Sequence, residues 1–79
     1  MLSISLATAP LTAMLVDSAK RLAQARIDLS TSTPGANAKK LSDANGEMTA
    51  AQSDIGNGNW AGAIGHYGNA WDKALAAVK

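Results

Sequence analysis

The stretch that decides the fold is GNGNWAGAIGHYGNAWDKALAAVK, residues 56–79. It opens with two Gly-Asn pairs, which are typical of a tight turn, and either Asn57 or Asn59 is suited to cap a following helix. Apolar residues then recur every three or four positions, which is the spacing of an amphipathic helix. Their common face consists of Trp60, Ala63, Ile64, Tyr67, Ala70, Trp71, Ala74, Leu75 and Val78. We therefore predict a helix over residues 59–78.

A second helix precedes the turn. The same three-and-four spacing joins Leu41, Ala44, Met48, Ala51 and Ile55, and it predicts a helix over residues 37–55 that ends at the glycines. Thr33 and Asn37 both belong to residue types that begin helices. A glycine inside the helix, Gly46, costs about 1 kcal/mol relative to alanine, and we expect the helix to continue through it. Because the connection to residues 59–78 is short, the two helices should form an antiparallel hairpin.

A third helix is predicted over residues 10–29. Its apolar positions are spaced alternately by four and three, with Pro10 in the first turn. These positions are Leu11, Leu15, Ser18, Leu22, Ala25 and Leu29. Residues 30–36 lack any apolar period and contain Pro34-Gly35, so they should form a loop. The expected fold is one all-α domain of three helices.

Residues 1–9 form an apolar N-terminal segment in which Leu2, Ile4 and Leu6 alternate with serines. Alternation of this kind is the period of a β-strand, yet a short strand is not stable alone. Three alternatives stay open: the segment extends the helix that follows, it frays, or it adds to the surface of another chain. Of these three alternatives, we place extension of the following helix first.

The composition favours association with other protein surfaces. A chain of 79 residues buries little surface, and it has no cysteine to strengthen a small core. The hydrophobic share of 47% includes no phenylalanine, so the core is thin. Charged residues make up 16%, below the quarter or so of an average domain, which weakens repulsion between copies.

Several classes of function are not expected. The cations Lys20, Arg21 and Arg26 are accompanied by Asp17 and Asp28, so no basic patch for nucleic acid is present. The first 16 residues lack a basic start and are interrupted by Ser, Thr and Pro, so we expect neither a signal peptide nor a membrane span.

Catalysis and metal binding are not expected either. The single histidine, His66, stands at no helical spacing from Glu47, Asp54 or Asp72, so we expect it at a surface or an interface. No serine has an activating base, and no glycine-rich loop follows a strand. We therefore predict no catalytic residue, metal, cofactor or small-molecule substrate.

Residues 58–71 resemble the second half of a tetratricopeptide repeat. The family has a glycine in the turn, an aromatic residue two positions later, and then alanine, an aromatic residue and alanine. Here these places hold Gly58, Trp60, Ala63, Tyr67 and Ala70. The first half departs from the pattern, because Glu47, Ala50 and Asp54 replace the family's Trp, Leu and Tyr. The resemblance implies a helical hairpin over about residues 37–78 that is used for protein contact.

Within this hairpin, small alanines should let the helices approach while aromatic side chains fill the gaps. The residues expected to pack it are Trp60, Ala63, Tyr67, Ala70 and Trp71. Stacking of the aromatic residues on a ligand is the alternative. Two shorter resemblances exist: the Pro-Gly loop is similar to that of type III secretion needle subunits, and Trp60-Ala61-Gly62 to the turn of small secreted Trp-x-Gly hairpins.

The last helix carries three glycines, Gly62, Gly65 and Gly68, where the repeat family usually has charged residues. Each costs about 1 kcal/mol in a helix interior. A neighbouring chain that packs closely on a bare helix surface would explain them, and the alternative is that they have no role. We expect a subunit interface in which one chain inserts apolar N-terminal side chains, Leu2, Ile4, Leu6, Leu11 and Leu15, and another receives them at the glycines.

The function predicted from these features is that of a structural subunit that associates with copies of itself. An extracellular filament or a surface assembly fits the low charge, although a cytoplasmic location stays open. The main alternative is an adaptor that binds a peptide or helix of another protein. A regulatory or chaperone-like partner of a secretion system is the third.

Overall fold

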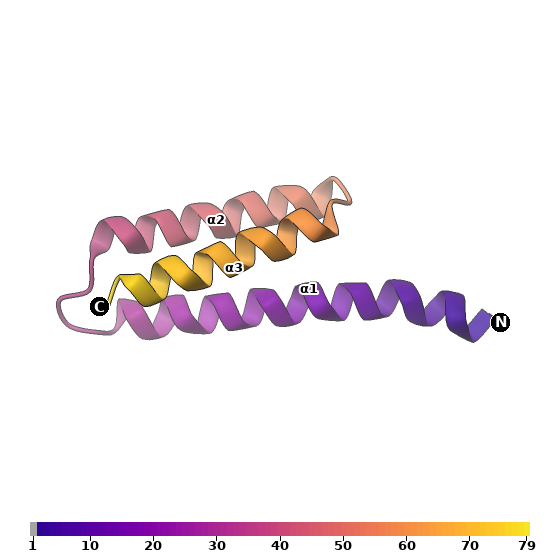
Figure 1. Cartoon of the computed structure of the whole chain (residues 1–79), viewed down its shortest axis with the longest axis horizontal. Helices are drawn as coiled ribbons and strands as arrows, with labels where there is room; N and C mark the ends of the chain where they lie inside the picture. The colour runs from indigo at the N-terminus through magenta and orange to yellow at the C-terminus, as the bar shows by residue number, and fades with distance from the viewer. Residues whose placement is uncertain (1) are drawn as a thin grey trace.

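A computed structural model describes the backbone of residues 2–79 and the side chains of residues 14–79. The described chain consists of three helices, α1 (Leu2–Thr31), α2 (Ala38–Gly56) and α3 (Trp60–Ala76), and residues 2–79 contain no strand. Figure 1 shows that α2 and α3 run antiparallel, joined by a tight turn. The all-α prediction, with a hairpin of the last two helices, is therefore confirmed.

Both turns of the chain place a glycine where other residues are strained. Gly35, between α1 and α2, has φ +80°, and Gly58, between α2 and α3, has φ +75°. Asparagines then cap the following helices, since Asn37 Oδ1 accepts from Lys40 N at 3.1 Å and Asn59 Oδ1 accepts from Gly62 N at 3.0 Å. These two caps fix where the hairpin begins and turns.

The first helix is longer than the sequence indicates. We predicted a helix over residues 10–29 after an apolar segment 1–9, but α1 is continuous from Leu2 to Thr31. Once a helix exists, each added residue gains a backbone hydrogen bond, and residues 2–9 offer no competing partner strand. Of the three alternatives for the N-terminal segment, the first, extension of the following helix, is what the structure has over residues 2–9. In Figure 1 the N-terminal part of α1 extends well past the hairpin.

The central helix of the fold is α3, which contacts α2 on one side and α1 on the other (Figure 1). Its inward positions are almost all alanine, so both neighbours lie close. Ala63, Ala70 and Ala74 are fully buried, and they meet Ala44 and Ala51 of α2 in one core cluster. Tyr67, which is 1% exposed, supplies the bulk that the alanines lack.

A buried hydrogen bond ties the C-terminal end of α1 to α3. Ser30 is fully buried, and its Oγ donates to the carbonyl oxygen of Ala74 at 2.7 Å. Nearby, Asn37 N donates to the carbonyl oxygen of Ala77 at 2.8 Å, so the loop before α2 also contacts the end of α3. Satisfied polar groups of this kind give a small core a unique arrangement.

The structure contains a single hairpin. Within residues 2–79, α1 packs on α3 but does not form a second unit with the geometry of α2 and α3. The likeness to tetratricopeptide repeats thus stays a resemblance in the sequence of α3 and its turn.

Candidate functional site

The most distinctive surface of the molecule is apolar and is shared by α1 and α3. Large hydrophobic side chains are exposed on these two helices, whereas α2 exposes none. They are Met14 (63%), Leu15 (57%), Leu22 (65%) and Leu29 (58%) on α1, and Trp60 (39%), Ile64 (40%) and Trp71 (38%) on α3. We call these seven residues the apolar face. Exposed leucines are ordinary singly, but a group of this size is typical of a contact surface.

The leucines of the apolar face are those of the spacing that predicted α1. The helix packs its own core through a different stripe, which has smaller residues: Val16, Ala19, Ala23, Ile27 and Ser30. Small side chains let α1 approach the alanines of α3 closely, whereas leucines would hold the two helices apart. The stripe with the larger apolar side chains is therefore left outside the fold.

A groove between α1 and α3 adjoins the leucines. Its volume is about 350 Å³. The lining residues are Ala19, Leu22, Ala23, Ile64, Tyr67, Gly68, Trp71 and Asp72. Seven of these eight residues are apolar or glycine, and Asp72 stands at the edge of α3, so the groove suits a hydrophobic side chain or helix face.

The predicted interface residues are placed as follows. Leu2, Ile4, Leu6 and Leu11 lie outside the residues whose side chains are described. Leu15 belongs to the apolar face. The structure therefore describes only the C-terminal part of this predicted set.

The three glycines do not share one environment. A Cβ atom at Gly62 would lie 2.4 Å from Asn59 Nδ2 and 2.7 Å from Asp54 Oδ2, so this glycine makes room for a contact within the hairpin. Gly65 and Gly68 are exposed, and a Cβ at either would meet open space. A contact within the hairpin therefore explains Gly62, whereas Gly65 leaves the outer side of α3 bare and Gly68 lines the groove beside α1.

The residues predicted to pack the hairpin divide into two groups. Ala63, Tyr67 and Ala70 are buried in the core. Trp60 and Trp71 are more than a third exposed, and Trp71 lines the groove beside α1 rather than the contact with α2. The sequence places them on one helical face, but that face is broad, and only its centre is covered by the neighbouring helices.

His66 joins α3 to α2 through two carboxylates. Its Nδ1 lies 2.8 Å from Glu47 Oε1 and its Nε2 lies 3.4 Å from Asp54 Oδ2. Asn69 Nδ2 also donates to Glu47 Oε1, at 3.3 Å. Sequence reasoning missed this cluster because it compared spacings along a single helix. Glu47 and His66 stand at similar distances from the turn at residues 57–59, which is the signal that an antiparallel hairpin offers.

The contacts in this cluster shift the pKa values of His66 and Glu47 in directions that both favour the charged forms. The hydrogen bond to Glu47 raises the pKa of His66, and the two carboxylates add to this effect against partial desolvation. The same hydrogen bond lowers the pKa of Glu47. The histidine and carboxylates therefore stabilise each other as a charged group, and His66 acts here as a contact between helices.

Tyr67 carries a polar atom that the core does not satisfy. Its hydroxyl is buried and has no hydrogen-bond partner among residues 14–79. Burial raises the pKa of this phenol, and the nearby Asp17 adds to the shift. The hydroxyl stays neutral and contributes no hydrogen bond to the fold.

Among the described residues, no three His, Cys, Asp or Glu side chains form a group that could hold a metal ion. No helix over the described part of the chain is long and apolar enough to cross a membrane. Comparisons with protein families, with curated proteins and with solved structures find no match to this chain.

Proposed function

We propose that this chain is a structural subunit that associates with copies of itself through the apolar face of α1 and α3. The observation that carries the proposal is the exposure of Leu15, Leu22 and Leu29, each more than half exposed on one side of α1. Burying a fully exposed leucine side chain is worth at most about 1.5–3 kcal/mol, and covering the exposed part of each of these favours contact with another surface. An extracellular filament or surface assembly is the wider role that fits such a subunit.

Growth beyond a pair needs a second contact surface. The outer side of α3 offers one at Gly65, which lies outside the groove lining and leaves helix backbone uncovered. Contacts between two different faces extend into open chains, whereas a face that meets itself closes. The apolar N-terminal part of α1, which extends past the hairpin, is the segment that we expect to reach such a surface.

A second candidate function is an adaptor that binds one helix of another protein. The groove between α1 and α3 favours it, because Ile64 and Trp71 on one side and Leu22 on the other form a lined channel. Helix-in-groove recognition uses sites of this kind. Under this alternative the chain stays monomeric by itself and gains a partner only when that helix is present.

The test is molar mass in solution, measured by light scattering over a concentration series. The proposal expects the mass to rise from that of a monomer as concentration increases. Leu22→Lys should reduce association, while Gln24→Lys, which adds the same side chain on a different side of α1, should not. Both positions are exposed, so neither change should unfold the monomer. A monomeric mass at every concentration would contradict the proposal and favour the adaptor.

A further inference from the structure

The spacing of the exposed residues on α1 specifies the shape of the partner. Leu15, Ser18, Leu22, Ala25 and Leu29 follow one another at steps of three, four, three and four, and all five are exposed. We call them the leucine seam. A mean step of 3.5 residues is the repeat of two helices that run side by side for several turns. The seam therefore fits a long helix better than a small ligand or a flat surface.

Large and small residues alternate along the seam. Leu15, Leu22 and Leu29 stand one heptad apart, and Ser18 and Ala25 lie between them. In a parallel pair of identical helices, each position meets itself, so leucine fills one layer while serine or alanine leaves a gap in the next. In an antiparallel pair, Leu22 faces Ala25 of the other copy and Leu29 faces Ser18. Every layer then combines one large and one small side chain, which packs evenly.

The charges beside the seam select the same direction. Arg21 flanks the seam on one side and Arg26 on the other, and Asp28 stands one heptad after Arg21. A parallel pair would place Arg21 of one copy opposite Arg26 of the other, which repel. The antiparallel pair places Arg21 opposite Asp28, and the symmetry of the pair makes this contact twice. Charges at these flanking positions set the partner and the orientation of paired helices.

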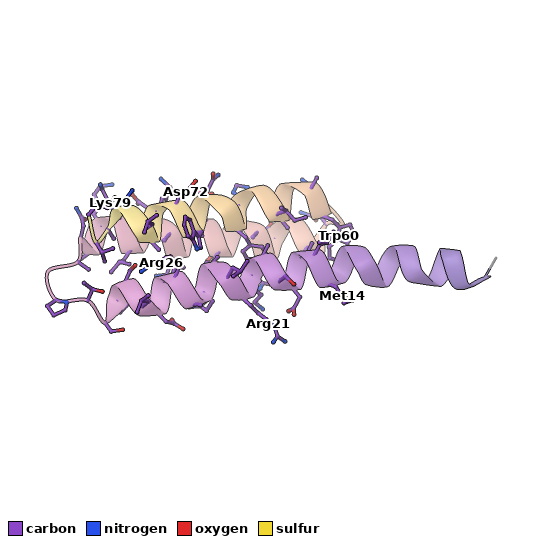
Figure 2. The ribbon with its side chains drawn as sticks, turned by 60° about the horizontal axis from the view of Figure 1, so that its bottom comes forward. Met14, Arg21, Arg26, Trp60, Asp72 and Lys79 are labelled. Carbon is purple, nitrogen blue, oxygen red and sulfur yellow. The ribbon has the colours of Figure 1, made fainter. Side chains whose placement is uncertain are left out.

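The side chains that would make this contact are available. Arg21 points away from α2 and α3 in Figure 2, and it is 80% exposed. Arg21 Nε forms a salt bridge with Asp17 Oδ2 at 2.8 Å. This pair is exposed and lies within one helix, so it contributes little to stability. Asp28 is exposed and accepts from Gln24 of the same helix at 2.9 Å. Neither residue is held in the core.

From these observations we infer that the partner of the leucine seam is the α1 helix of a second copy, antiparallel, with Arg21 of each chain opposite Asp28 of the other. The inference rests on the proposed function and names its contact. The pair is two-fold symmetric and uses one patch twice, so it closes as a dimer. Any larger assembly is then built from such dimers through a different face.

Charge exchange tests the arrangement without disturbing the leucines. The variants Arg21→Asp and Asp28→Arg each place like charges opposite one another in the antiparallel dimer. Each alone should dimerise about three- to tenfold more weakly than wild type at low salt, as measured by sedimentation equilibrium. An equimolar mixture should recover the affinity, because the two variants complement each other. Lys39→Asp, which removes an exposed pair of the same kind on α2, is the matched control and should change nothing.

The outcomes distinguish failure of the antiparallel contact from failure of self-association. If Arg21→Asp strengthens dimerisation and Asp28→Arg has no effect, the helices are parallel and the inference is wrong. If wild type associates but the mixed variants do not recover, copies meet elsewhere, so the inference fails while the proposed function stands. If wild type does not associate at any concentration, both fail. Circular dichroism of each variant verifies that the monomer remains helical.

Discussion

Replacing Tyr67 by alanine should remove a large part of the stability of this protein. The side chain is 1% exposed and is the largest fully buried one among the described residues. A buried aromatic side chain removes about 150–250 Å² from water, which at about 25 cal/mol per Å² gives about 4–6 kcal/mol. Many of the residues in the same core cluster are alanines, whose short side chains cannot move in to fill the space, so a cavity should remain.

The hydroxyl of Tyr67 reduces this figure. A buried polar group without a hydrogen bond costs about 1–3 kcal/mol, and alanine relieves that cost. The expected net loss is therefore about 3 kcal/mol. Domains are stable by about 0.05–0.15 kcal/mol per residue, which for a chain of this length is about 4–12 kcal/mol. The variant should be marginally folded.

The assay is urea unfolding followed by far-ultraviolet circular dichroism. With a slope of about 1–3 kcal/mol per M urea, the midpoint should fall by about 1–3 M. Self-association would raise apparent stability, so the comparison is best made with all variants carrying Leu22→Lys at one protein concentration. Tyr67→Phe is the matched control. It keeps the ring and removes only the unsatisfied hydroxyl, so its midpoint should stay equal to wild type or rise.

Two results would refute the reasoning. A loss below about 1 kcal/mol in Tyr67→Ala would mean that the ring does not support the contact of α3 with α1 and α2. A loss in Tyr67→Phe comparable with that of Tyr67→Ala would mean that the hydroxyl has a hydrogen-bond partner that matters.

Three other changes have defined outcomes. The pKa of His66 is raised in the folded state, so its contribution to stability is complete below about pH 6.5 and is lost as pH rises through the folded pKa. The thermal midpoint should therefore fall across that pH range. In His66→Gln the midpoint should depend less on pH. Gly65→Ala should stabilise the protein by about 0.5–1 kcal/mol in urea unfolding, because the added Cβ enters open space. Gly62→Ala should instead destabilise the protein, because its Cβ would displace the side chain of Asn59, which caps α3. Equal effects of the two changes would contradict the different environments of the two glycines. Ser30→Ala should lower the unfolding free energy by about 0.5–1.5 kcal/mol, and an unchanged midpoint would show that the buried bond contributes nothing.

The hairpin could be predicted from sequence because its signals are local. The Gly-Asn turn, the cap at Asn59 and the apolar period of residues 60–78 depend on neighbours within a few positions. The length of α1 was harder to predict, because residues 2–9 alternate like a strand. Whether they form a helix depends on the helix that follows them. The bounds of the other two helices differ from the prediction by one or two residues at each end.

The packing of α1 could not be read from the same pattern. Two stripes on this helix have helical spacing and equal numbers of apolar residues, and the one with leucines has the larger side chains. The choice between them depends on what α3 presents, which is a row of alanines that accepts Val16, Ala23 and Ile27 at close range. A single sequence does not show which helices become neighbours. The cluster of His66 with Glu47 was missed for the same reason.

The position of α3 between its two neighbours has a consequence during synthesis of the chain. The ribosome releases α1 and α2 before α3, but these two helices contact each other little without it. At about 5–20 residues per second, residues 57–76 take about 1–4 s to be made. For that interval the nascent polypeptide holds both faces of α1 in solvent, including Ala23 and Ile27, which are later covered. Because α3 follows both of its neighbours along the chain and closes the core between them, the folding of these three helices is delayed until α3 emerges.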